Sequence, residues 1–182
     1  MPGYERVVKY FAKPGPENTD GVVKAVVKRI VSNGIKRVVV ASTSGRTGLK
    51  FAEALRGKAN LIVVSHESVD SELKEKIVKL GGTVVDNAHL PLHGKGMDRV
   101  RDSFYTLGQG FKVAVEVILI AADKNLVKRY EDVIGVGGSG EGADTAIIAR
   151  ATPTGEIFSR NKSKRLEVKE ILAIPLRKKW WD

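Results

Sequence analysis

The residues Val38-Val39-Val40-Ala41-Ser42-Thr43-Ser44-Gly45-Arg46-Thr47 decide the fold of this chain. Four consecutive apolar residues, three of them β-branched, predict a buried strand over 38–41. The polar residues that follow lead directly into a helix expected over 47–55, which Gly57 ends. A buried strand that passes straight into a helix is the repeating unit of parallel α/β sheets.

Strand and helix patterns alternate along the rest of the chain. The apolar residues of 22–31 recur at helical spacing, with Asn18 or Thr19 able to cap the first amides and Asn33-Gly34 as a left-handed stop. Further strands are expected over 61–64, 83–85, 132–136, 145–151 and 171–174, and further helices over 72–80 and 97–107. This alternation predicts an α/β fold with a mostly parallel sheet, covered on both faces, in a single domain spanning residues 1–182.

Residues 111–126 carry two conflicting signals. Val113, Val115 and Val117 favour a strand by propensity. A run of about 15 residues without a turn is longer than the usual strand, however, and this length favours a buried helix. We expect a helix here.

Composition excludes several classes of protein. The chain has 182 residues, of which 42% are apolar and 29% charged, as in ordinary globular proteins. It contains no cysteine, which excludes a thiol nucleophile, a thiolate metal site and a disulfide framework. Its longest apolar run, 113–122, is interrupted by Glu116 and is too short to span a bilayer, and Met1-Pro2-Gly3-Tyr4-Glu5 does not resemble a signal peptide. We expect a cytoplasmic protein with no membrane partner, and the scarcity of glutamine and cysteine suggests a thermophilic source.

Half of the net charge of +10 lies at the C-terminal end, where residues 160–182 carry eight basic and three acidic side chains. Such a run is usually a solvated surface, and this interpretation is favoured. A nucleic-acid contact is the alternative, because Lys178 and Lys179 precede Trp180 and Trp181, which could stack on bases. Adjacent tryptophans more often dock on their own domain or on a neighbouring subunit, so a homo-oligomer stays open.

The loops that follow the predicted strands differ from those that precede them. Segments 42–47, 65–68, 86–96 and 137–144 are rich in glycine, hydroxyl groups, histidine and charge. In parallel sheets ligands bind outside the carboxyl ends of the strands, which is where these loops lie. The sequence therefore places any functional site at this edge.

The first of these loops has the composition of an anion site. A helix start offers free amides and a partial positive charge, and an arginine can add a charge-assisted pair with phosphate oxygens. The candidate binding residues are Ser42, Thr43, Ser44, Gly45, Arg46 and Thr47. The Gly-Lys-Ser/Thr ending of a Walker loop is absent, and a capped turn without a ligand is the alternative.

A second candidate contact is the glycine-rich segment Gly135-Val136-Gly137-Gly138-Ser139-Gly140. It matches the pattern of dinucleotide-binding loops but is followed by an expected strand instead of a helix, so we reject that function. A strand, a glycine loop and a returning strand could offer successive amides to an anion, or could be an unliganded hairpin. The candidate residues are Gly137, Gly138, Ser139 and Gly140, with Asp144 and Thr145 after them.

The three histidines do not predict a metal site. His89 and His93 have helical spacing, but Pro91 lies between them and no carboxylate motif accompanies them. At this edge His66 and His89 could be hydrogen-bond donors to a ligand, or ordinary loop residues. Lys112, Glu116, Asp123 and His66 are polar candidates near the same edge, and each could equally be a structural salt bridge. No catalytic residue is assigned.

With these loops identified, residues 19–152 resemble the C-terminal domain of pyruvate kinases, which holds an allosteric sugar bisphosphate. The resemblance is carried by segments 38–47 and 135–145, the second with a Gly-Ser-Gly. The whole chain looks closer still to a small archaeal family of stand-alone proteins. The further motifs of that family are Lys13-Pro14-Gly15-Pro16-Glu17-Asn18-Thr19, Gly108-Gln109-Gly110-Phe111-Lys112-Val113-Ala114-Val115-Glu116 and Gly142-Ala143-Asp144-Thr145-Ala146.

This resemblance implies three layers, with helices on both faces of a five-stranded sheet ordered 3-2-1-4-5 whose last strand is antiparallel. It also implies that 111–126 is a helix. The catalytic barrel of the kinases is absent, so phosphoryl transfer does not carry over. The stand-alone family implies flavin mononucleotide (FMN) as cofactor, with its phosphate on 42–47 and its ring nearer 137–145 and the loop of His89. A flavin-dependent redox role with an unknown substrate, a non-catalytic sensor of a phosphorylated metabolite and nucleic-acid binding are the functions to compare.

Overall fold

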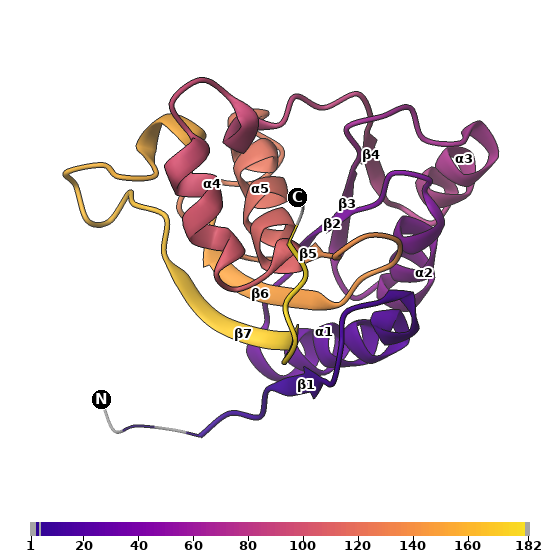
Figure 1. The fold of residues 1–182 in the computed structure, drawn as a ribbon. Helices are drawn as coiled ribbons and strands as arrows, with labels where there is room; N and C mark the ends of the chain where they lie inside the picture. Colours follow the sequence, from indigo (N-terminus) through magenta and orange to yellow (C-terminus); the bar gives the residue numbers. More distant parts are fainter. Residues whose placement is uncertain (1–2, 4, 181–182) are drawn as a thin grey trace.

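The computed structural model describes residues 3 and 5–180, so Trp181 lies outside the described residues. Within them a single mixed sheet is covered by helices (Figure 1). The strands are β1 Lys9–Phe11, β2 Arg37–Ala41, β3 Asn60–Val64, β4 Thr83–Val85, β5 Asp132–Gly137, β6 Thr145–Arg150 and β7 Val168–Pro175. The α-helices are α1 Thr19–Asn33, α2 Arg46–Leu55, α3 Ser71–Lys79, α4 Asp98–Tyr105 and α5 Gln109–Asp123. Short 3-10 helices are η1 Pro16–Asn18, η2 Pro91–His93 and η3 Thr154–Glu156.

The sheet of the described residues has seven strands in the order β1-β7-β6-β5-β2-β3-β4, so the expectation of a five-stranded sheet is wrong. Strands β2, β3, β4 and β5 are parallel, and β6 is antiparallel to both of its neighbours. Strand β7 was expected from its apolar residues. Strand β1 was not, because two of its three side chains, Lys9 and Tyr10, are exposed, and its pairing with β7 is decided by contacts distant in sequence.

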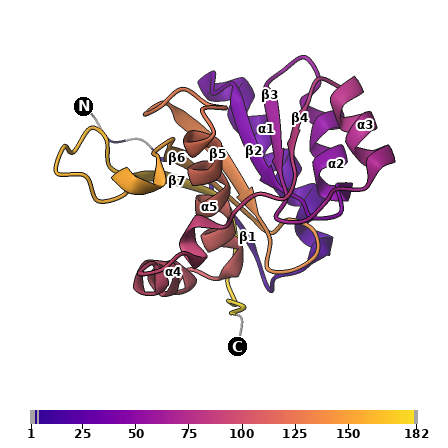
Figure 2. The ribbon, with the colours of Figure 1, turned by 90° about the horizontal axis from the view of Figure 1, so that it is seen from above.

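Helices cover both faces of the sheet, as the alternation predicts (Figure 2). The side chains of Val38 and Val40 join the core under α1 and α2, whereas Val39, between them, joins the core under α5. Successive residues of a strand point to opposite faces, so an uninterrupted apolar strand feeds both cores. The mostly parallel α/β class is therefore confirmed.

Helix α5 is the most deeply buried helix, and it occupies the ambiguous segment of the sequence. Twelve of its residues are buried, which explains why its composition is close to that of a core strand. It packs closely on β5 because that strand has glycine at two positions, Gly135 and Gly137. A Cβ at Gly135 would lie 2.4 Å from the carbonyl oxygen of Ala114, and one at Gly137 would lie 2.3 Å from that of Gly110. The helix expectation for this segment is confirmed.

Local signals placed the helix ends correctly where glycine has a left-handed conformation. Helix α1 ends at Gly34, whose φ is +69°, and the Gly34 N–H donates to the carbonyl of Ile30.

None of the helices in the described residues combines the length and the apolar character that a membrane span requires.

Candidate functional site

The loops that follow the parallel strands lie together at one edge of the sheet. Loop 42–45 follows β2, loop 65–70 follows β3 and loop 86–97 follows β4. They are linked by hydrogen bonds: the Ser65 hydroxyl donates to the Thr43 carbonyl at 3.4 Å, and the Ala88 N–H donates to the Ser65 carbonyl at 2.9 Å. Three of the predicted loops therefore form one connected surface.

Loop 42–45 turns sharply into α2 at Gly45, whose φ is +93°. A Cβ at this position would also lie 2.8 Å from Cγ1 of Val69. Ser42 is buried, and its Oγ accepts the N–H of Gly48 at 3.1 Å. The Ser42 hydroxyl therefore caps the third amide of α2, that of Gly48. This is the role that the sequence predicts for Ser42 if the turn binds no ligand.

The rest of this loop keeps donors available. Thr43 and Ser44 are exposed, and α2 has no side-chain cap at its N-cap residue, Gly45. The Arg46 N–H has only a long contact of 3.4 Å with Oγ of Ser44, and within the described residues no acceptor is present for the N–H of Thr47. The first two amides of α2 are therefore not capped by a short hydrogen bond, and a helix start with such amides and exposed hydroxyls beside it favours an anion.

Loop 138–144 approaches the same place from the other side. Nη1 of Arg46 lies 3.5 Å from Oε1 of Glu141, and the two side chains are 76% and 72% exposed. The two segments proposed to hold an anion thus face each other, although they are separated by almost a hundred residues of chain. An exposed ion pair of this kind contributes about 1 kcal/mol or less, so another anion can replace the carboxylate.

The polar side chains of the second loop are turned into the protein. Asp144 is buried, its Oδ2 accepts the Ser139 N–H at 3.0 Å, and its Oδ1 accepts the Thr145 hydroxyl at 2.8 Å. Oγ of Ser139 accepts the Gly110 N–H at 3.3 Å. Ser139 therefore fastens the loop to α5, whereas Asp144 bonds to Ser139 and Thr145 and holds the loop together.

The glycines of this loop serve packing more than ligand contact. Gly137 lies in β5 under α5, and a Cβ at Gly138 would lie 2.2 Å from the carbonyl oxygen of Gly142. Gly140 is exposed. The glycines of the pattern that resembles a nucleotide-binding loop are therefore explained mainly by packing, because other backbone atoms lie where their side chains would be.

The three histidines have different surroundings. His66 is exposed, with Nε2 3.4 Å from Oε1 of Glu67, and His89 is exposed in loop 86–97. His93 is also exposed, but its Nε2 lies 2.6 Å from Nζ of Lys112. Among the described residues no group of three or more histidine, aspartate or glutamate side chains could hold a metal ion.

Lys112 and Glu116 form a buried ion pair at the start of α5. Their charged atoms are 2.6 Å apart and their side chains are 2% and 3% exposed. The other oxygen of Glu116, Oε1, accepts the N–H of Leu92 at 3.0 Å. Burial lowers the pKa of Lys112 below its ordinary value, although the charge of Glu116 opposes this shift. Although His93 is an exposed residue, partial desolvation of its imidazole lowers its pKa, and the neighbouring Lys112 lowers it further.

Asp123 lies away from this site, which corrects the sequence-based expectation. It ends α5, whose N-terminus is the end at the carboxyl edge, so Asp123 is at the opposite edge. Its carboxylate accepts the N–H and the hydroxyl of Thr154 at 2.8 and 2.6 Å. Asp123 therefore has a structural role at the start of η3.

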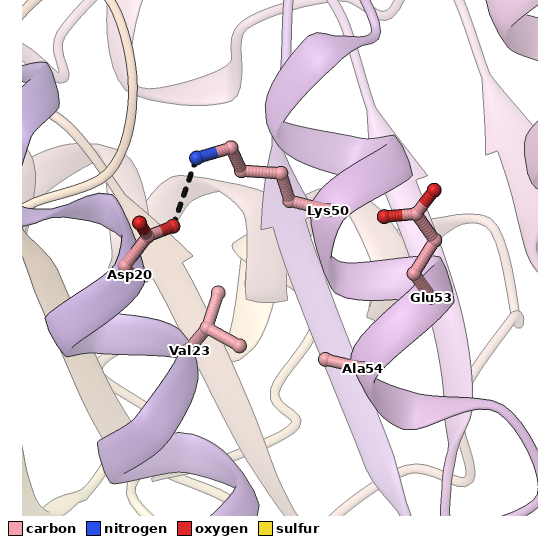
Figure 3. Close-up of a pocket in the computed structure, with 5 residues that line it drawn as sticks. All are labelled: Asp20, Val23, Lys50, Glu53 and Ala54. Atoms are coloured by element: carbon pink, nitrogen blue, oxygen red, sulfur yellow. Dashed lines mark hydrogen bonds and ion pairs between the residues drawn. The ribbon is translucent and has the colours of Figure 1, made fainter.

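A shallow depression of about 470 Å³ lies between α1 and α2 (Figure 3). It is lined by Asp20, Val23, Lys50, Glu53 and Ala54. Nζ of Lys50 is 2.8 Å from Oδ1 of Asp20, and the hydrogen bond from Lys50 lowers the pKa of that carboxyl group. None of these residues was expected at a site, because single polar residues on a helix surface carry no sequence signal.

The basic residues after β7 are held by backbone and side-chain hydrogen bonds. The Gln109 N–H donates to the carbonyl of Lys179 at 2.9 Å, and Nζ of Lys178 donates to the carbonyl of Pro175. Trp180 is 59% exposed, so its ring does not dock on the domain.

No model of a known protein family matches this chain. The family resemblance therefore stays a prediction from the motifs, and the function has to be inferred from the site itself.

Proposed function

We propose that this protein binds a phosphorylated small molecule at the carboxyl edge of its sheet, and that FMN is the first candidate for this ligand. The observation that supports this most is the meeting of Arg46 with Glu141 across the two loops. It brings a guanidinium, the first amides of α2 and exposed hydroxyls to one point. Each of these groups favours a phosphate dianion.

The donor set fits a phosphomonoester. The Thr47 N–H and the hydroxyls of Thr43 and Ser44 can donate to its oxygens, and Arg46 can pair with two of them at once. Glu141 would give up its contact with Arg46, because a dianion attracts the guanidinium more strongly than a single carboxylate does. The remainder of the ligand would extend over loops 65–70 and 86–97. Bound FMN would supply redox chemistry there.

Titration of the protein with FMN, followed by flavin fluorescence, tests this proposal. Replacing Arg46→Ala together with Ser44→Ala should weaken binding by more than tenfold, which is about 1.4 kcal/mol. Arg56→Ala is the matched control, because it removes a cation from the opposite end of α2. The proposal is wrong if FMN at micromolar concentration does not bind, or if both substitutions weaken binding equally.

A sensor of another phosphorylated metabolite is the second candidate, because the available donors of loop 42–47 recognise a phosphate and not a flavin ring. Thermal unfolding with sugar phosphates, FMN and riboflavin separates the two functions. A ligand at a hundred times its dissociation constant stabilises by about 2.7 kcal/mol. Stabilisation by a sugar phosphate and not by FMN would favour the sensor.

Nucleic-acid binding through the basic C-terminal segment is the third candidate, supported by the exposure of Trp180 beside Lys179. Binding to a single-stranded oligonucleotide should then weaken steeply as salt is raised. A complete lack of binding at low salt would remove this candidate.

A further inference from the structure

A buried charged cluster lies beside the proposed ligand site and has no part in holding the phosphate. Nζ of Lys112 lies 2.6 Å from Oε2 of Glu116 and 2.6 Å from Nε2 of His93. The lysine and the glutamate are almost fully buried, whereas His93 is exposed. Burying two charges is costly, and well-packed apolar residues often stabilise a core as well or better. The hydrogen-bonded path from the buried ammonium of Lys112 to the exposed imidazole of His93 suggests a function other than stabilising the fold.

The hydrogen-bond partners in the cluster fit one arrangement of its protons, with an ammonium on Lys112 and a carboxylate on Glu116. Glu116 accepts hydrogen bonds at both oxygens, from Lys112 and from the N–H of Leu92, so it is a carboxylate. A protonated lysine can only donate, so Nε2 of His93 accepts from it. The proton of the neutral imidazole is then on Nδ1. The donor N–H of His93 is therefore on Nδ1, the ring nitrogen that is not bonded to Lys112.

The surrounding charges favour this state. Arg101 and Tyr105 approach from α4 and His66 from the loop after β3, while Lys112 and Glu116 belong to α5. Partial desolvation of the imidazole lowers the pKa of His93 most, and the neighbouring Lys112 and Arg101 lower it further, against the opposing effect of Glu116. Burial lowers the pKa of Lys112 as well, which makes its ammonium a better proton donor.

His93 follows β4 and lies at the same edge of the sheet as loop 42–47. Strand β4 is the second neighbour of β2, and adjacent strands are about 4.8 Å apart, so the ends of these two strands are separated by about 10 Å. The loop between them carries His66 and is bonded to both through Ser65. An extended nucleotide such as FMN can span this distance with its phosphate at one end and its ring at the other.

We propose that His93 transfers a proton to the ring portion of the bound ligand and that Lys112 replaces it. The Nδ1 proton passes to an acceptor atom of the ligand, and Nε2 takes a proton from the ammonium of Lys112. Lys112 becomes a neutral amine beside Glu116. A proton from solvent then binds Nδ1 of His93, and Nε2 returns its proton to Lys112, which restores both groups. His93 is the residue that contacts the ligand, whereas Lys112 and Glu116 are positioning residues. This inference rests on the proposed ligand site.

Three variants separate proton transfer from simple packing. His93→Gln keeps an acceptor for Lys112 but cannot pass a proton. The double variant Lys112→Met with Glu116→Gln leaves no unpaired buried charge and keeps an acceptor for the N–H of Leu92. Lys95→Gln is the control, because it changes another exposed polar side chain of the same loop.

The first measurement is the ¹⁵N NMR spectrum of the histidine rings, recorded against pH with and without FMN. His93 should carry its proton on Nδ1, FMN should shift its titration, and inorganic phosphate alone should not. In the double variant the proton should redistribute between the two ring nitrogens. FMN that binds without any change at His93 would overturn the inference and leave the proposed function intact.

The second measurement is the rate at which dithionite reduces bound FMN without oxygen, followed by the loss of flavin absorbance in H₂O and in D₂O. The reduced ring takes up a proton, so His93→Gln and the double variant should slow the reduction at least tenfold. Equal rates in all variants would overturn the inference alone. Failure of FMN to bind would instead overturn the proposed function, and this inference with it.

Discussion

Glu141 is the residue that a phosphate has to replace at Arg46. Its side chain is 72% exposed, so the ion pair is weak. Glu141→Gln should therefore raise the affinity for FMN or inorganic phosphate by up to about fivefold, since about 1 kcal/mol corresponds to that factor. The gain should shrink at high salt, where exposed charges are screened. Glu53→Gln, on the exposed side of α2, serves as control, and equal affinities would show that Glu141 does not compete.

Gly137 is required by the contact of β5 with α5. A Cβ there would lie 2.3 Å from the carbonyl oxygen of Gly110 and 2.6 Å from the amide nitrogen of Ala114, and neither backbone atom can move freely. Gly137→Ala should lower the free energy of unfolding by about 1–3 kcal/mol or more in urea denaturation. Gly155→Ala has nothing within 4 Å and should have little effect. Similar stabilities of the two variants would contradict this packing argument.

At the scale of elements, Thr19 connects α1 to the loop between β5 and β6. Its Oγ1 accepts the Ala143 N–H at 3.0 Å and donates to the Pro16 carbonyl at 2.7 Å. Thr19→Val keeps the shape but leaves a buried N–H unpaired, so we expect a loss of about 1–3 kcal/mol and faster hydrogen exchange of Ala143. Thr83→Val, at an exposed position of β4, is the control. Unchanged exchange at Ala143 would show that the loop is held by other contacts.

Most helices and strands could be predicted from sequence because their signals are local. Helical spacing, buried β-branched runs and stop glycines act within a few residues and gave nearly correct bounds for α1, α2 and β2. Strand β1 could not be found in this way, because a three-residue strand depends on its partner β7 at the far end of the chain. The five-stranded sheet implied by the resemblance lacks both β1 and β7, although the apolar residues of β7 are a local signal, so only the omission of β1 has this cause.

At the scale of the whole molecule, the buried cluster should make stability depend on pH. The pKa of His93 in the folded protein lies below its ordinary value of 6.5, so the unfolded chain binds more protons as pH falls through that value. Stability should therefore be lost as pH is lowered from 7 toward the folded pKa, and level off below it. Urea denaturation between pH 5 and 8 should show a smaller loss in His93→Gln. An identical pH dependence would show that His93 is not the group responsible.

The order of strands and helices along the chain was enough to locate the candidate site, since loops that leave parallel strands must share one edge. Which groups in those loops stay available was decided by the tertiary structure. Ser42, Ser139 and Asp144 were expected to face a ligand but are bonded within the protein, whereas Arg46 meets Glu141 and Lys112 meets His93. Propensity and spacing describe interactions between near neighbours in sequence. The partner of a side chain depends instead on packing between segments far apart in the chain, which those local signals do not contain.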